Sequence, residues 1–156
     1  QIRMARGAAA RSLGRNRTAG APMIRARSSD VPWLTEFSNG EYQARADATP
    51  EKGGGNRGFR PHELLEAALA SCMNITLRMA AAKHDIALGE VVVTVTLNRL
   101  APAEAVFTYS VHWDRAVTDA QRAVLIAALD NCPVRNTLSR SIRCVSTASS
   151  WTSTAT

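Results

Sequence analysis

The 156-residue sequence has three cysteines, few aromatic residues and no uninterrupted run of 18 apolar residues. A membrane-spanning helix needs about 20 predominantly apolar residues, so we expect no segment to cross a membrane. The N-terminus lacks the unbroken apolar core of a secretory signal. Three widely spaced cysteines do not make the disulfide framework of a secreted protein. We therefore expect a reducing compartment, the cytoplasm, where a cysteine pair would serve catalysis or redox chemistry.

Acidic residues are absent from positions 1–29, which hold seven arginines. Positions 30–156 carry 12 Lys+Arg and 13 Asp+Glu, so their formal charge is about −1 although the whole chain carries +6. The positive charge is thus confined to the N-terminal segment, and the rest of the chain has no basic bias. We do not expect nucleic-acid binding.

The first 22 residues are rich in arginine, alanine and glycine and contain no acid. We expect residues 1–22 to form a flexible basic extension outside the fold. A mitochondrial-type transit peptide has the same composition, and so has an arm that contacts nucleic acid or a partner protein. Residues 23–156 are long enough to form one domain with a sizeable core.

Glycine is absent from residues 61–83, and the only proline there is Pro61. Apolar residues recur at three- and four-residue spacing, which predicts a long helix with one wide buried face. That face is expected to comprise Leu64, Leu65, Ala68, Leu69, Cys72, Ile75, Thr76 and Met79. Pro61 suits the first turn of a helix. Glu63 and Glu66 suit the positive end of the helix dipole, with an acid–base pair as the alternative.

Alternating apolar and polar residues predict strands on both sides of this helix. We expect a strand at 23–28, a hairpin over 33–47, an antiparallel hairpin of 91–98 and 105–113, and a last strand at 141–148. Residues 48–60 are glycine-rich without the following lysine–serine or lysine–threonine pair of a phosphate-binding loop, so we interpret them as a flexible connection. Thr118 and Gln121 form a capping-box pattern that predicts a second helix, ending at Cys132 before Pro133. This order predicts an α+β domain.

The cysteines of the two predicted helices, Cys72 and Cys132, both fall on the expected core side. By themselves, buried free cysteines are most often small apolar core residues. Cys144 falls on the last predicted strand, where we expect it to pack in the core. The three histidines are isolated from one another and from the cysteines, so we expect no metal site.

Two motifs give the cysteines another interpretation. Residues 53–88, GGGNRGFRPHELLEAALASCMNITLRMAAAKHDIAL, resemble the OsmC/Ohr family of thiol peroxidases (osmotically inducible protein and organic hydroperoxide resistance protein). In that family a glycine-containing loop and a proline precede a reactive cysteine by the spacing seen between Pro61 and Cys72. The second family motif is matched by Cys132-Pro133-Val134, with Thr137-Leu138 after it. The resemblance extends over about residues 24–147.

The resemblance implies an α+β fold with antiparallel sheets and a long central helix, in an intertwined homodimer with active sites at the subunit interface. It implies that Cys72 is the peroxidatic thiol and Cys132 the resolving thiol. Cys72 would reduce a bulky organic hydroperoxide and become a sulfenic acid, which Cys132 would convert into a disulfide. A dithiol, in this family usually a lipoyl group on a protein partner, would restore the thiols. No cofactor or metal is implied.

The chain departs from the best-studied peroxidases of the family, which activate the thiol with an arginine on the early hairpin and a glutamate directly after the motif proline. Here His62 follows the proline, and Glu63, one place later, becomes the candidate activating carboxylate. No arginine occupies positions 33–35, where it is expected. The alternative arginines are Arg27, Arg45 and Arg60. The chain is therefore more similar to the OsmC-like branch than to the organic hydroperoxide resistance branch.

Glu63 lies nine residues before Cys72, a rise of roughly 13 Å if the two share one straight helix. Glu63 would then act on Cys72 only if the helix breaks or if the partner subunit supplies the carboxylate. The alternative to an enzyme is a non-catalytic OsmC-like dimer that binds a small hydrophobic ligand at its interface. The retained cysteine pair favours the enzyme, and the missing arginine favours the binding protein.

Overall fold

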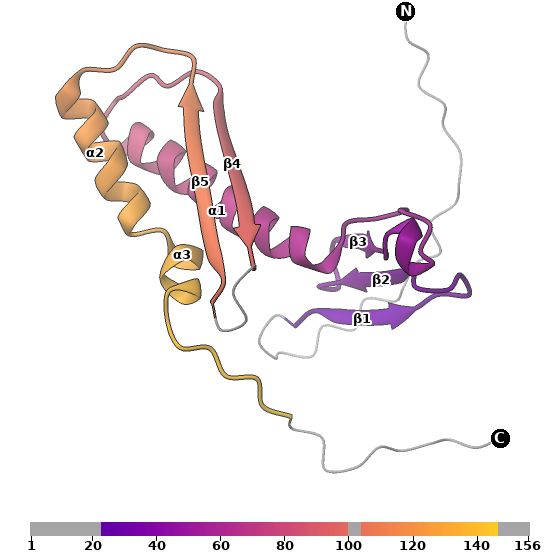
Figure 1. Cartoon of the computed structure of the whole chain (residues 1–156). Helices are drawn as coiled ribbons and strands as arrows, with labels where there is room; N and C mark the ends of the chain where they lie inside the picture. The colour runs from indigo at the N-terminus through magenta and orange to yellow at the C-terminus, as the bar shows by residue number, and fades with distance from the viewer. Residues whose placement is uncertain (1–22, 100–103, 147–156) are drawn as a thin grey trace, which may run out of the picture. The chain divides into compact units, whose positions relative to one another are not determined.

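The computed structural model describes residues 23–99 and 104–146. The expected extension, residues 1–22, and the end of the expected last strand lie outside the described residues. The elements in chain order are β1 (Arg25–Ser28), β2 (Thr35–Ser38), β3 (Gln43–Ala46), the short 3-10 helix η1 (Pro50–Lys52), α1 (Pro61–Lys83), β4 (Val91–Asn98), β5 (Val106–Trp113), α2 (Asp119–Asp130) and α3 (Pro133–Leu138) (Figure 1). The chain divides into two compact units, one ending at Glu63 and the other beginning at Leu64.

The N-terminal unit contains an antiparallel sheet of three short strands in the order β1-β2-β3. The side-chain oxygen of Asn39 fixes the turn between β2 and β3, because it accepts hydrogen bonds from the N–H groups of Glu41 at 2.9 Å and Tyr42 at 2.8 Å. Gly40 takes a φ of +94°, which L-residues with side chains rarely adopt. The structure confirms the expected hairpin and the strand before it.

The glycine-rich segment 48–60 is tied to β3, so its interpretation as a flexible connection was wrong. The carboxylate of buried Asp47 accepts backbone hydrogen bonds from Ala48 at 2.8 Å, Gly55 at 3.1 Å and Arg57 at 3.0 Å. These hydrogen bonds, that of Arg57 foremost, hold the pKa of Asp47 below its usual value. A Cβ on Gly54 would lie 2.0 Å from the carbonyl oxygen of Ala48, so only glycine fits there.

The C-terminal unit is built from α1, α2, α3 and the hairpin of β4 and β5. The hairpin is antiparallel, as expected, and its register pairs Val91 with Trp113 and Asn98 with Val106. Figure 1 shows α1 behind this hairpin and α2 beside it. Residues of both helices form the core with the apolar face of the hairpin. The buried core residues are Leu69, Met73, Leu77, Ala81, Ile86, Leu88, Leu125, Leu129 and Cys132.

The helix α1 has the predicted bounds but buries a narrower stripe than predicted. Its buried residues follow four-residue spacing and are Leu69, Met73, Leu77 and Ala81. Leu65, Ile75 and Met79 were expected in the core but are 43%, 55% and 69% exposed. The reason is that two apolar stripes lie side by side on α1, and one chain covers only one of them. We call the uncovered one, Leu65, Ala68, Ile75 and Met79, the outer stripe.

Among the described helices, α1 alone is long and apolar enough to cross a membrane by length and composition, with a mean hydropathy of 1.2 over 18 residues. That test is a weak indication, because the core helix of a globular domain also passes it. Here four residues of α1 are buried in the core of the C-terminal unit.

The capping box at the start of α2 is present as predicted. The hydroxyl of Thr118 accepts from the N–H of Gln121 at 3.2 Å, and the side-chain oxygen of Gln121 accepts from the N–H of Thr118 at 2.9 Å. After α2 the structure departs from the sequence prediction, because Pro133 starts the short helix α3 and does not merely end α2. Proline favours the first turn of a helix, where its missing N–H would have no partner.

The expected last strand is absent from the described residues, because 141–146 have no strand pairing and are exposed throughout. Ile142 is 60% and Val145 is 72% exposed, so these residues bury no apolar face in one chain. Cys144 is exposed as well, which contradicts the expectation that it packs in a sheet. A strand needs a second strand to pair with, and no described strand pairs with this segment.

Candidate active site

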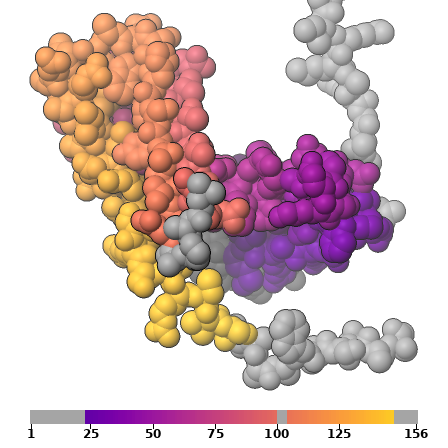
Figure 2. All heavy atoms as spheres, in the orientation of Figure 1, coloured from indigo at the N-terminus to yellow at the C-terminus, as the bar shows by residue number. Residues whose placement is uncertain are grey.

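Cys72 and Cys132, the two cysteines of the sequence motifs, come together in the C-terminal unit. Cys72 is half-buried in the middle of α1, on the border between the core stripe and the outer stripe. Cys132 is fully buried and lies between α2 and α3 as the N-cap residue of α3. Figure 2 shows the orange atoms of β5 and α2 next to one another on this face of the C-terminal unit.

Cys132 is placed between helices by backbone hydrogen bonds on both sides. Its N–H donates to the carbonyl of Leu129 in the last turn of α2 at 3.1 Å, and its carbonyl accepts from the N–H of Asn136 in α3 at 2.9 Å. Pro133 supplies the first helical residue of α3, where it needs no donor. The cysteine–proline pair of the second motif therefore sets the junction of the two helices and the position of one thiol.

The thiol of Cys72 packs against the core that contains Cys132, and it affects the titration of Cys132. Burial is the main cause that raises the pKa of the Cys132 thiol, and the backbone N–H of Arg135 opposes it. Interaction with the nearby thiol of Cys72 raises the pKa of Cys132 further. Cys132 therefore remains a protonated thiol at neutral pH.

Glu63, the third candidate, lies in the first turn of α1 and is engaged by Arg60. The backbone N–H of Arg60 donates to Glu63 Oε2 at 2.9 Å and its Nε donates to Oε1 at 2.6 Å. Arg60 Nη2 also forms an ion pair with Oε1. The hydrogen bonds from the side chain and backbone of Arg60 hold the pKa of Glu63 below its usual value. Glu63 is therefore ionised at neutral pH, and α1 continues unbroken from it past Cys72.

The other candidate arginines have different surroundings. Arg45 pairs with Glu36 across the strands β2 and β3, with Nη2 3.1 Å from Oε1, and both side chains are largely exposed. Arg27 faces the same glutamate from β1 in the strand register. The early hairpin thus carries arginines, but at positions other than the one that the family motif predicts.

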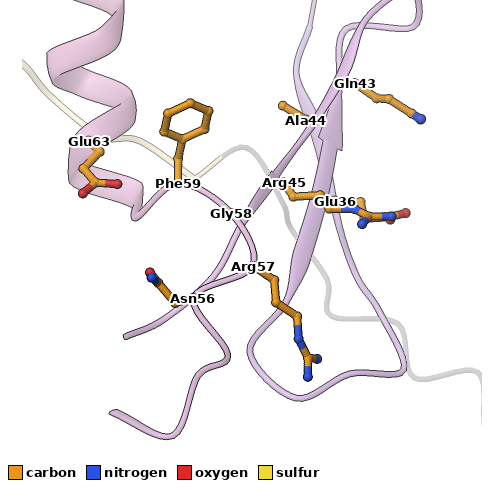
Figure 3. Close-up of a pocket in the computed structure, with 9 residues that line it drawn as sticks. All are labelled: Glu36, Gln43, Ala44, Arg45, Asn56, Arg57, Gly58, Phe59 and Glu63. Carbon is orange, nitrogen blue, oxygen red and sulfur yellow. The ribbon is translucent and has the colours of Figure 1, made fainter. Parts of the chain in front are cut away.

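A hollow of about 630 Å³ lies in the N-terminal unit. Figure 3 shows Arg45 and Glu36 close together on one side of it, Glu63 and Phe59 on another, and Arg57 directed away from the Arg45–Glu36 pair. Its nine lining residues are Glu36, Gln43, Ala44, Arg45, Asn56, Arg57, Gly58, Phe59 and Glu63. Neither cysteine of the motifs is among them.

Sequence reasoning missed two contacts that anchor α1 to β4. Glu66, interpreted as a helix-start charge, accepts a hydrogen bond from the N–H of Leu97 at 2.6 Å. Asn74 donates to the carbonyl of Val91 at 2.7 Å. A polar residue within an apolar helix is the signal that would have indicated Asn74, but its partner could not be identified without the fold. Within the described ranges, no group of three histidine, cysteine, aspartate or glutamate side chains is placed to hold a metal ion.

The fold and the cysteine pair define an α+β protein of two antiparallel sheets and a long helix that carries a half-buried thiol next to a buried one. Residues 53–146 match the family described as OsmC-like protein. The chain therefore belongs to the OsmC-like protein family. No curated protein matches the sequence.

Several solved structures share the fold. A proposed osmotic stress induced and detoxification response protein of Psychrobacter arcticus is 18% identical, with a TM-score of 0.65 over 77% of this chain and 90% of that one. The OsmC-like protein of Mycoplasma pneumoniae is 21% identical, with a TM-score of 0.60 over 78% and 89%. The organic hydroperoxide resistance protein OhrB of Bacillus subtilis is 18% identical, with a TM-score of 0.56 over 78% and 93%.

Proposed function

We propose that this protein is a thiol-dependent peroxidase that reduces organic hydroperoxides with Cys72 and Cys132. The observation that carries the proposal is that the two motif cysteines come together in one core, one half-buried beside an exposed apolar surface and one fully buried. Family membership and the names of relatives such as the Bacillus subtilis hydroperoxide resistance protein are consistent with it. The substrate would be a bulky hydroperoxide, because the outer stripe of α1 offers apolar contacts next to Cys72.

The first step is attack of the Cys72 thiolate on the peroxide O–O bond. The sulfur gives two electrons to the oxygen that it binds and becomes a sulfenic acid, and the other oxygen leaves as an alkoxide that takes a proton and departs as an alcohol. The Cys132 thiol lies in the core against which Cys72 packs, so it is near at hand for the step that follows. Because its own pKa is raised, Cys132 does not compete for the peroxide.

The second step is attack of the Cys132 sulfur on the sulfenic sulfur of Cys72. The S–S bond forms, and the sulfenic oxygen leaves as water with the proton of the Cys132 thiol. Two electrons must then come from outside, and a dithiol such as a lipoyl group on a protein partner supplies them by thiol–disulfide exchange. This exchange requires a reducing compartment such as the cytoplasm.

The active form is proposed to be an intertwined homodimer. Four exposed positions of α1 form the outer stripe beside Cys72, and an exposed apolar helix face is usually covered in the functional state. The partner subunit would also bring its Glu63, ionised and held by Arg60, to the thiol, because α1 does not break between Glu63 and Cys72. Residues 23–156 would form the domain and residues 1–22 an extension that catalysis does not need.

The alternative is a non-catalytic dimer that binds a small hydrophobic ligand. The exposed apolar residues of the outer stripe favour it, and so does the absence of an arginine at positions 33–35. In that case the cysteine pair would be a structural remnant. Oxidation of the pair by hydroperoxide decides between the two functions.

Steady-state turnover of cumene hydroperoxide tests the proposal, with dithiothreitol or dihydrolipoate as the reductant. We expect turnover by the natural sequence and its loss in Cys72→Ser, while Cys144→Ser should keep the natural rate because Cys144 lies outside both motifs. A protein that is folded and reduced but consumes no hydroperoxide with either dithiol is a binding protein. Turnover that survives Cys72→Ser would contradict the assignment of the peroxidatic thiol.

A further inference from the structure

We propose that Glu66 and Asn74 are positioning residues that hold α1 against β4 and thereby keep the Cys72 thiol directed at Cys132. The inference rests on the peroxidase function proposed above. Both residues extend from α1 to the backbone of a single strand. Glu66 Oε1 accepts from the N–H of Leu97 at 2.6 Å, and Asn74 Nδ2 donates to the carbonyl of Val91 at 2.7 Å, both in partly buried surroundings.

The two anchors bind opposite ends of one strand edge. The positions of Val91 and Leu97 differ by an even number, so their backbone groups point to the same side of β4. The opposite edge of β4 pairs with β5 along its whole length. Glu66 and Asn74 are eight residues apart on α1, a rise of roughly 12 Å, so the contacts fix both the sliding and the rotation of this part of the helix.

Cys72 lies between the two anchors along α1 but projects from the other side of the helix. At roughly 100° per residue, Glu66 and Asn74 project about 120° and 160° away from Cys72, in opposite rotational senses. They therefore define the flank of α1 that faces the edge of β4, while the thiol occupies the flank that meets Cys132. A rotation of the helix that breaks the anchors would carry the Cys72 sulfur away from its partner.

Such a rotation would affect the two chemical steps unequally. Attack on the hydroperoxide needs only an accessible thiolate, and Cys72 borders the exposed outer stripe. Disulfide formation needs the two sulfurs aligned, and Cys132 is buried and held between α2 and α3. The sulfenic acid has a competing fate, because a second hydroperoxide molecule can transfer one oxygen to it, giving a sulfinic acid and an alcohol. The anchors should therefore set the ratio of disulfide to sulfinic acid.

Mass spectrometry of the Cys72 peptide after a pulse of excess cumene hydroperoxide measures this ratio. Asn74→Leu and Glu66→Leu remove one anchor each, whereas Glu66→Gln keeps a side-chain oxygen that can accept from Leu97. Ser71→Ala is the matched control, because the Ser71 hydroxyl donates to the carbonyl of Ala68 within α1 itself, at 3.2 Å, and not to β4. We expect the sulfinic fraction to rise about fivefold in the two leucine variants, as for loss of one hydrogen bond. In Glu66→Gln and Ser71→Ala the sulfinic fraction should equal that of the natural sequence.

The rate of the first step, followed with one equivalent of hydroperoxide, should stay within about twofold in every variant that circular dichroism shows to be folded. If Asn74→Leu does not fold, Asn74→Ala replaces it. If the folded anchor variants give the same ratio of disulfide to sulfinic acid as the natural sequence, the inference is wrong. An equal rise of the sulfinic fraction in Ser71→Ala would also overturn it. In both cases the peroxidase proposal stands. If the natural sequence forms neither sulfenic acid nor disulfide, the proposed function itself is wrong.

Discussion

Replacing Met79 by lysine should weaken the proposed homodimer without unfolding the chain. Met79 belongs to the outer stripe and is 69% exposed in one chain. Complete burial of a methionine side chain contributes about 1.5–3 kcal/mol, so burial of the exposed part contributes about 1–2 kcal/mol. A symmetric dimer contains the site twice, which gives about 2–4 kcal/mol and a dissociation constant raised about 30- to 1,000-fold. Desolvation of the lysine would increase the effect.

Sedimentation velocity over a wide concentration series measures the association. The matched control is Ala67→Lys, which adds the same charge to the same helix outside the outer stripe and should leave the dimer as in the natural sequence. A natural sequence that stays a folded monomer at the highest concentration would refute the reasoning. Equal weakening by both lysine substitutions would also refute it, because the effect would then follow from charge and not from the stripe.

Four further outcomes follow from the structure. Leu125→Ala should lower the free energy of unfolding by about 3–5 kcal/mol in urea titrations, because Leu125 is fully buried. The pKa of Asp47 is lowered in the folded chain, so its contribution to stability is complete at a pH above its usual pKa of 3.8. That contribution is lost as the pH falls through the lower pKa of the folded state. Asp47→Asn should therefore remove this part of the acid dependence of the melting temperature. A chain that starts at Met23 should keep its melting temperature and its association. Limited alkylation should modify exposed Cys144 early and buried Cys132 last, and early modification of Cys132 would contradict its raised pKa and burial.

Local patterns in the sequence predicted most elements of the fold. The capping box at Thr118, the alternation of β4 and β5 and the absence of helix breakers after Pro61 act within a few residues, so they were recognisable without the fold. The buried stripe of α1 could not be assigned, because an apolar face contains no information on which neighbour covers it. The same limit explains residues 141–146, whose alternation resembles a strand but which pair with no strand among the described residues.

The candidate site was predictable in its cysteines but not in its supporting contacts. Cys72 and Cys132 lie far apart in the sequence, and their motifs indicated that they act together. The carboxylate of Asp47 and the anchors Glu66 and Asn74 act on backbone groups, which every residue carries. The residue that supplies the backbone group can be of almost any type, so the sequence alone could not show which residues make such a contact.

The most direct test of the central claim is peptide mapping after one equivalent of cumene hydroperoxide. The account predicts a Cys72–Cys132 disulfide within one chain and a mass loss of two hydrogens. Cys132→Ser should instead hold Cys72 as a sulfenic acid that excess peroxide converts to sulfinic and sulfonic acids. A Cys72–Cys144 bridge, a bridge between subunits, or no oxidation of Cys72 at all would contradict the account.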